Sequence, residues 1–301
     1  MEERNIMQVF LLPVMAVLLF FSCNNNGRSM FKTENSVGFD TIMVAERSYL
    51  EEDTTKPYCD IRVEFVYPVN SGKASLDTLQ RFFVKSMLGQ PYDSLAPAEA
   101  VKAYVNNYIE NYNYDATTYR ESAIDMLEMN TLIPGIDLLE SEHFPEDVFY
   151  SYYESLSDSI VFNRSGVLAF QVRQSNNKGG STSYDSYRNY VINLNTGQQV
   201  TENEIFNAGY DIALQSLIIA SLLDKNNVKT VEELEDLGYF GVLEIVPNKN
   251  FLLNDKGIIY TYNKGEYSAY QLDAPQVFIP YSLIRSLLRE NSIAYKLAGL
   301  Q

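Results

Sequence analysis

Residues 160–192 read IVFNRSGVLAFQVRQSNNKGGSTSYDSYRNYVI, and this stretch decides the fold class. Within it, Val167–Gln174 and Tyr184–Ile192 alternate apolar and polar side chains, a period of two that is typical of β-strands. Asn176–Gly180 between them is a cluster of turn-forming residues and predicts a hairpin. Two further strands are predicted upstream, over Phe149–Leu156 and Ile160–Asn163. Together the four strands predict an antiparallel meander.

Helices and further strands flank this region on both sides. On the N-terminal side, Ile61–Tyr67 alternates as a strand that ends at Pro68, and a helix is predicted over Leu76–Leu88, between the N-cap Ser75 and the stop Gly89. Pro97 opens a second helix, which we expect to fray beyond Tyr112 because Asn106, Asn107 and Asn111 are poor helix formers. The C-terminal side predicts helices over Asp211–Leu223, Val231–Leu237 and Tyr281–Leu288, and strands over Phe251–Leu253, Ile258–Tyr262 and Gln276–Ile279. This order predicts an α+β fold with antiparallel sheets, arranged as a meander, and helices packed on one face.

The N-terminus resembles an export signal. Val9–Phe21 is an uncharged apolar run, shorter than the ~20 residues that span a bilayer, and Ser22-Cys23 follows at once. Cleavage before Cys23 would leave a thiol on the new N-terminus, where a lipid can be attached. We therefore expect a lipoprotein signal peptide at residues 1–22 and a tether at 23–38. The alternatives are a buried helix or an ordinary signal peptide with an incidental cysteine, and translation could begin at Met1 or at Met7.

Composition narrows the classes of partner. With 46% hydrophobic and 21% charged residues the chain is ordinary for a globular protein. Its net charge of −16 repels nucleic acid and anionic lipid surfaces. The charge would suit a basic partner, or it could reflect only a soluble surface. With Cys23 lipidated, Cys59 would have no partner in the chain, and we expect it to be a buried, inert thiol.

The sequence carries no motif of a known catalytic site. The single histidine, His143, excludes two-histidine zinc sites, and there is no G-x-S-x-G elbow, Gly-rich phosphate loop or calcium loop. We expect no catalytic residues, metal or cofactor. A pair of carboxylates that cleaves glycosidic bonds would be invisible among so many acidic residues.

Tyrosine is abundant, with 23 residues against no tryptophan, and it suits surfaces that are half apolar and half wet. The aromatic hairpin and the later aromatic segment are the candidate contact face. Equally, alternating strand tyrosines could all point inward. The candidate ligand-contact residues are Tyr184, Tyr187, Tyr190, Tyr260, Tyr262, Tyr267 and Tyr270.

The last third of the chain resembles a known extracytoplasmic domain. Phe251–Asn263 (FLLNDKGIIYTYN), Glu266–Tyr270 (EYSAY) and Val277–Leu283 (VFIPYSL) are similar to successive strands and turns of the RsiV-like family, domain of unknown function 3298. Asn193–Gly197 (NLNTG) resembles the turn that precedes its helix, and Ile61–Pro68 resembles the PdaC-type companion domain. The resemblance implies a companion α+β domain at 39–147 and an RsiV-like α+β domain at 148–301. The bulky residues before Cys23 resemble the signal of Bacteroidota lipoproteins.

The resemblance also implies classes of function. One branch of the family binds lysozyme, and another accompanies a polysaccharide deacetylase. We therefore expect a non-catalytic, lipid-anchored envelope protein that binds a lysozyme-like protein or a cell-wall glycan such as peptidoglycan. The alternatives are a carboxylate-dependent enzyme acting on envelope polysaccharide and a structural subunit of an envelope complex. Asn24–Asn26 lacks the acidic run that resembles a surface-export tag, so we expect an outer-membrane lipoprotein that faces the periplasm.

Overall fold

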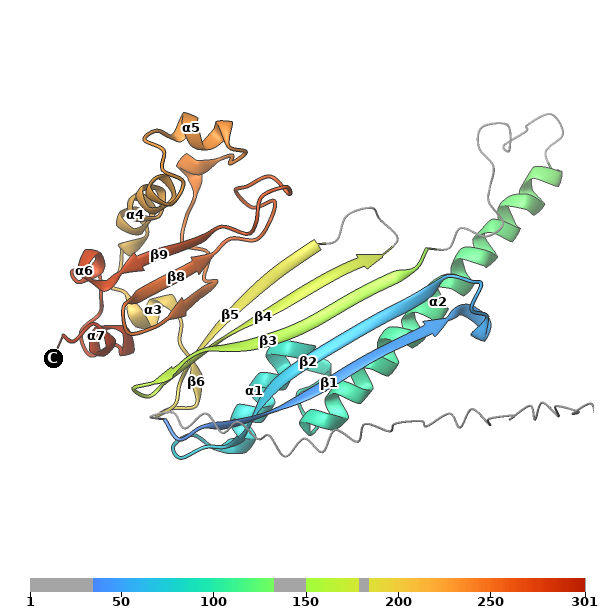
Figure 1. Ribbon diagram of the computed structural model, residues 1–301, viewed down its shortest axis with the longest axis horizontal. Helices are drawn as coiled ribbons and strands as arrows, with labels where there is room; N and C mark the ends of the chain where they lie inside the picture. The colour runs from blue at the N-terminus through green and yellow to red at the C-terminus, as the bar shows by residue number, and fades with distance from the viewer. Residues whose placement is uncertain (1–34, 133–149, 179–183, 301) are drawn as a thin grey trace, which may run out of the picture.

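The computed structural model describes residues 35–132, 150–178 and 184–300. Its larger sheet has six strands in the order β1-β2-β3-β4-β5-β6 (Figure 1). All neighbours are antiparallel except β2 and β3, which run parallel. The strands are β1 (Gly38–Tyr49), β2 (Tyr58–Asn70), β3 (Tyr152–Arg164), β4 (Val167–Lys178), β5 (Tyr184–Asn193) and β6 (Gln198–Gln199).

The predicted meander is confirmed for β3, β4 and β5, with one correction. The two strands predicted over Phe149–Leu156 and Ile160–Asn163 are a single strand, β3, whose register slips between Ile160 and Phe162. Such an irregularity breaks the alternation of side chains without ending the strand. Phe149 itself and the turn residues Gly179 and Gly180 lie outside the described residues.

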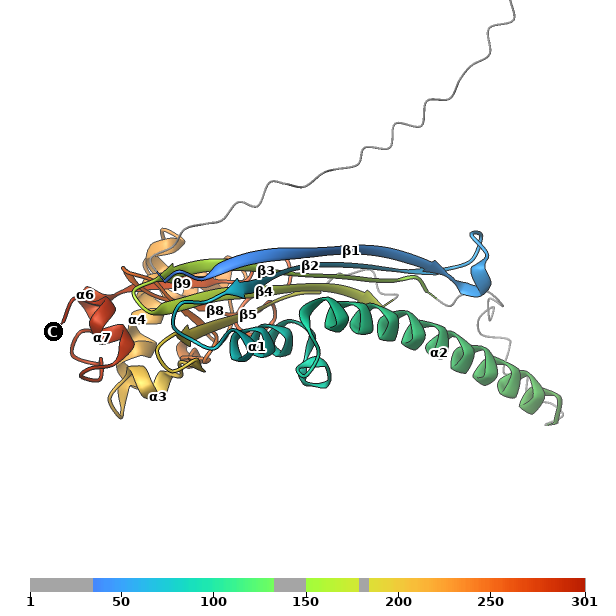
Figure 2. The ribbon, with the colours of Figure 1, turned by 90° about the horizontal axis from the view of Figure 1, so that it is seen from below.

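Two helices cover one face of this sheet, α1 (Leu76–Leu88) and α2 (Pro97–Leu132) (Figure 2). The ring of Phe83 on α1 stacks on Phe170 of β4, with ring centroids 4.1 Å apart. The predicted fraying of α2 beyond Tyr112 is wrong, because Tyr112 and Ala116 are buried against Leu50 and Cys59. Packing on the sheet therefore overrides the weak helix propensity of this segment. Cys59 is buried, as predicted, and burial raises the pKa of its thiol.

The C-terminal residues form a second lobe around a three-stranded antiparallel sheet, β7-β8-β9. Its core includes Phe162, Ala169 and Val191, which alternate along their strands with side chains that face α1 and α2, so the lobe packs on the opposite face of the large sheet. The helix predicted over Tyr281–Leu288 is shorter in the structure, where it ends at Ile284. The elements of the lobe are α3 (Glu202–Ile205), α4 (Tyr210–Lys225), α5 (Val231–Asp236), the 3-10 turn η3 (Val242–Glu244), β7 (Phe251–Leu253), β8 (Gly257–Thr261), β9 (Gln276–Pro280), α6 (Tyr281–Ile284) and α7 (Ile293–Leu297).

The whole is a mixed α+β structure, as predicted. Strands from both sides of residue 148 share the large sheet, because β2 pairs with β3. They also share one core, in which Val63 and Phe65 lie with Leu156 and Phe170. The division into domains at 39–147 and 148–301 therefore stays a prediction. Its boundary falls between β2 and β3, which are neighbours in one continuous sheet.

The first described residue, Asn35, is buried and hydrogen-bonded to β3 and to the turn between β3 and β4. The side chain of Asn35 donates to Asn163 Oδ1 at 3.0 Å and to the carbonyl of Val167 at 2.8 Å, and it accepts from the amide of Gly166 at 2.7 Å. Val37 is buried as well. A free tether would therefore end before residue 35, not at 38. The predicted signal peptide, Cys23 and His143 lie outside the described residues, among which no helix combines the length and apolarity that crossing a membrane requires.

Candidate ligand groove at the edge of β5

The outer edge of β5 has a neighbouring strand over a short length. Among the described residues, β6 pairs with Ile192 and Asn193 of β5 alone. The preceding residues of β5 face the small lobe instead, and β7 lies against this part of the large sheet. An unpaired strand edge exposes backbone donors and acceptors that need other partners.

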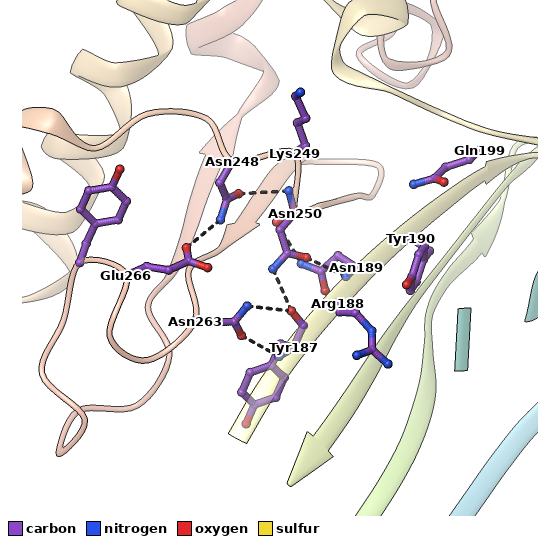
Figure 3. A pocket seen from close by; sticks show the side chains of 11 residues that line it. Tyr187, Arg188, Asn189, Tyr190, Gln199, Asn248, Lys249, Asn250, Asn263 and Glu266 are labelled. Carbon is purple, nitrogen blue, oxygen red and sulfur yellow. Dashed lines mark hydrogen bonds between the residues drawn. The ribbon is translucent and has the colours of Figure 1, made fainter. Parts of the chain in front are cut away.

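Asparagine side chains from the small lobe supply those partners (Figure 3). The amide of Tyr187 donates to Asn263 Oδ1 and the amide of Asn189 donates to Asn250 Oδ1, both at 2.7 Å. Asn250 Nδ2 donates in turn to the carbonyls of Tyr187 and Thr261, each at 2.9 Å. Side-chain amides thus take the place of a strand and fix the lobe against β5.

A buried carboxylate supports the loop that carries Asn248 and Asn250. Glu202 on α3 accepts the backbone amide of Lys249 at 3.0 Å and the hydroxyl of Tyr210 at 2.8 Å. Lys249 has a φ of 62°, a left-handed conformation that is uncommon for a residue with a side chain. Asn248 Oδ1 accepts the amide of Asn250 at 3.1 Å and closes the turn. The loop is therefore fixed from within and from α3.

Between β5 and this loop lies an open groove of about 580 Å³. Its lining combines aromatic rings with amide and charged side chains, a mixture suited to ligands that have both apolar and hydroxyl-bearing faces. Glu266 is the one carboxylate among the lining residues. The lining is formed by Tyr187, Arg188, Asn189, Tyr190, Gln199, Asn248, Lys249, Asn250, Asn263, Glu266 and Tyr267.

Three of the predicted contact tyrosines, Tyr187, Tyr190 and Tyr267, line the groove. Tyr190 is also anchored in the core, because its ring stacks on Phe170 at 5.1 Å. Tyr267 contacts Tyr262 edge-on, with ring centroids 5.5 Å apart. The groove thus gathers predicted residues that are about 80 positions apart in the sequence.

Three of the other predicted tyrosines, Tyr260, Tyr262 and Tyr270, lie elsewhere. Tyr260 and Tyr262 are fully buried, so as direct ligand contacts these two predictions are wrong. Both belong to the core of the lobe, and burial raises the pKa of each phenol. Tyr270 is 55% exposed but lies outside the groove lining. Tyr184 opens β5, and its side chain lies outside the described part of the chain.

Sequence reasoning missed the asparagines and Glu202. Pro247-Asn248-Lys249-Asn250 and Asn263 follow strands or turns, where asparagine is common for reasons of local backbone geometry. Their bonds to β5 span more than 60 positions, for example from Asn250 to Tyr187. The high density of asparagine beside predicted strand ends was the available signal, and it does not specify a partner.

Residues 203–282 match the sequence model of a family described as "Protein of unknown function (DUF3298)". Over these residues the chain is similar to the DUF3298 family. No curated protein matches the chain. The matched residues supply the wall of the groove from Asn248 to Tyr267, while β5, which precedes them, supplies the other wall.

Two solved structures have the same overall arrangement. A crystal structure of a DUF3298 family member from Bacteroides fragilis is 27% identical, with a TM-score of 0.75, and the match covers 89% of this chain and all (100%) of that one. A crystal structure of a DUF3298 family protein from Pseudomonas aeruginosa is 11% identical, with a TM-score of 0.56, covering 86% of this chain and 97% of that one. The second likeness concerns the fold alone. Both matches extend well beyond residues 203–282 into the large sheet.

Proposed function

We propose that this chain is a lipid-anchored, non-catalytic protein of the cell envelope that binds a cell-wall glycan in the groove beside β5. The observation that carries the proposal is the lining of the groove, which combines tyrosine rings with amide and charged side chains. A sugar ring presents an apolar C–H face and a rim of hydroxyls. Tyr187 and Tyr267 would contact the faces, and Gln199 and Arg188 would bind the hydroxyls.

The edge of β5 favours recognition by side chains over addition of a peptide strand. An incoming strand would need the outward backbone groups of Tyr187 and Asn189. Asn250 and Asn263 already bind them at 2.7–2.9 Å. A peptide would have to displace these hydrogen bonds, whereas a glycan would leave them in place.

The charge of the groove supports binding without turnover. Glycosidic cleavage by carboxylates needs two of them held ~5 to ~9.5 Å apart on either side of the bond. Glu266 is the one carboxylate that the described residues contribute to the lining, and it is exposed. A carboxylate-dependent enzyme would have to use a different surface of the molecule.

A pull-down of residues 24–301 with insoluble peptidoglycan tests the proposal. We expect the protein to sediment with the glycan, and Tyr187→Ala to weaken retention at least ~5-fold because the ring is lost from the groove. Tyr114→Ala on α2, which removes a tyrosine that is 71% exposed and distant in sequence from the groove, is the matched control. Equal retention of the two variants, or turnover of the glycan, would contradict the proposal.

A basic, lysozyme-like protein is the second candidate ligand. The net charge of −16 would steer such a partner toward the chain. Binding to lysozyme that weakens steeply with salt and is insensitive to Tyr187→Ala would favour this candidate.

A row of exposed apolar side chains supports a third candidate function, a structural role in an envelope complex. Leu237, Phe240, Leu243 and Val246 recur every three residues after α5, and each is exposed. Exposed apolar side chains in such number are typical of protein contact surfaces. Stable co-purification with a partner, lost on Leu243→Ser, would favour this role.

The anchor at Cys23 is part of the same proposal. Attachment of lipid there would tether the folded part to the outer membrane, and the absence of an acidic run at Asn24–Asn26 favours the periplasmic side. Metabolic labelling with a clickable fatty acid should give a signal on the full chain that Cys23→Ser abolishes. Labelling that persists in the Cys23→Ser variant would contradict the anchor.

A further inference from the structure

A second cavity, of about 590 Å³, lies where β2 and β3 stop pairing. The last backbone pair of these parallel strands joins Glu64 to Ser157. Beyond it the strands part, and side chains of β1, β2 and β3 line the space between them. This cavity shares no lining residue with the groove beside β5.

Asp158 sits at this opening and is 7% exposed. Its Oδ1 accepts the backbone amide of Val66 at 2.7 Å, in place of a strand carbonyl. Its Oδ2 is buried and has no hydrogen-bond partner within the described residues. Buried carboxyl oxygens nearly always have a hydrogen-bond partner. The free oxygen of Asp158 is therefore a candidate contact for a ligand.

The charges around the cavity are mostly negative. Glu64 and Asp255 line it together with Asp158, against the single guanidinium of Arg164, which is exposed. The remaining wall is largely apolar, with Phe39, Val66 and Ile160 among its side chains. A ligand that fits both features has a positive end and an aliphatic body.

We propose that this cavity binds a primary ammonium group on an aliphatic stem, the chemistry of a lysine side chain. The ammonium would pair with Asp158 Oδ2, and the stem would lie along the apolar wall. Glu64 and Asp255 would add attraction from the rim, and Arg164 would oppose it. The proposal does not rest on glycan binding in the groove beside β5.

Proton release follows from the same geometry. Burial, with a contribution from Glu64, raises the pKa of Asp158 to about 8, so its carboxyl is mostly neutral at pH 7. An ammonium at Oδ2 would favour the charged form and lower that pKa. Binding at pH 7 should therefore release up to one proton for each ligand bound.

Calorimetric titration of residues 24–301, which contain all of the described structure, tests the proposal. The ligand is Nα-acetyl-lysine methylamide at pH 7, in phosphate and in HEPES, whose ionisation enthalpies differ. We expect binding with proton release, and no binding of Nα-acetyl-norleucine methylamide, which keeps the stem without the charge. Absence of binding by the lysine derivative, or equal binding of the two, would overturn the proposal.

Variants assign the proton to Asp158. Asp158→Asn keeps the acceptor for Val66 and should weaken binding about tenfold or more and abolish proton release. Asp236→Asn removes an equal charge from the exposed end of α5 and should leave binding and proton release unchanged. The circular dichroism spectra of both variants should match that of the parent, which checks that they fold. Unaltered binding or proton release in Asp158→Asn would overturn the assignment.

Discussion

Asn250 holds the small lobe against β5 through both atoms of its amide. The oxygen accepts from Asn189, and the nitrogen donates to the carbonyls of Tyr187 and Thr261. Only the two amide residues supply an acceptor and two donors in one planar group, and asparagine has the shorter stem. The width of the groove therefore depends on this side chain.

Asn250→Asp should destabilise the protein although the change is nearly isosteric. The carboxylate keeps the acceptor for Asn189 but faces two carbonyl oxygens where the amide donated. We expect a loss of roughly 1–3 kcal/mol in the free energy of unfolding, measured by urea denaturation at pH 7. Asn106→Asp on the exposed face of α2 makes the same chemical change and should stay within ~0.5 kcal/mol of the parent. Equal effects of the two changes would contradict the role of Asn250.

Asp158 should make stability depend on pH. Its pKa is about 8 in the folded protein, against an ordinary value of 3.8, so the folded state binds more protons between these values. The stability that its neutral form contributes is complete below pH ~4 and is lost as pH rises toward ~8.

Asp158→Asn removes this titration. Relative to the parent, the variant should gain up to roughly 1 kcal/mol per pH unit between pH 4 and 8 in the free energy of unfolding. Urea denaturation across that range measures the difference, with Asp236→Asn as the control. Parallel pH profiles for the parent and Asp158→Asn would show that the carboxyl titrates normally.

At the scale of elements, the sequence predicts a helix accurately where the residues that begin and end it are close in the sequence. The helix predicted at Leu76–Leu88 is α1, with Ser75 as its N-cap and Gly89, at a φ of 103°, as its stop. The helix predicted over Val231–Leu237 is α5, which a capping box of Thr230 and Glu233 opens. The length of α2 and the union of two predicted strands in β3 depend instead on packing against distant residues, which no local pattern reveals.

The contact between α1 and β4 should contribute strongly to stability. Phe83 is fully buried and stacks on Phe170. Phe83→Ala should lower the free energy of unfolding by roughly 3–5 kcal/mol through lost burial and a residual cavity. Arg81→Ala, on the exposed face of the same helix, should change it by less than ~0.5 kcal/mol. Urea denaturation of both variants decides, and a small loss for Phe83→Ala would mean that α1 is loosely attached.

At the scale of the molecule, the parallel pair β2–β3 joins the two predicted domains. The core beneath α1 and α2 draws side chains from residues 61–105 and from 156–194. We therefore expect that residues 24–147 alone do not unfold cooperatively, whereas residues 24–301 do. Thermal unfolding of the two, followed by circular dichroism, tests this expectation. A cooperative transition in residues 24–147 would contradict it and would support the predicted domain boundary after residue 147.

The groove could not be assembled from the sequence for the same reason. Tyr187, Tyr190 and Tyr267 were predicted as contacts from aromatic content, but Tyr260 and Tyr262 share that content and are buried. The difference between them is set by how the lobe docks on β5, through asparagines whose partners lie more than 60 positions away. Composition thus predicts the class of surface, and long-range packing selects its members.

The most direct test of the groove is an NMR titration of isotope-labelled residues 24–301 with soluble, uncrosslinked peptidoglycan strands. We expect the backbone amide signals of Tyr187, Asn189, Lys249 and Tyr267 to shift together and to saturate with one dissociation constant. Those of Met43 in β1 and Tyr114 in α2 should stay unchanged. Shifts confined to residues outside the groove, or no shifts at all, would contradict it.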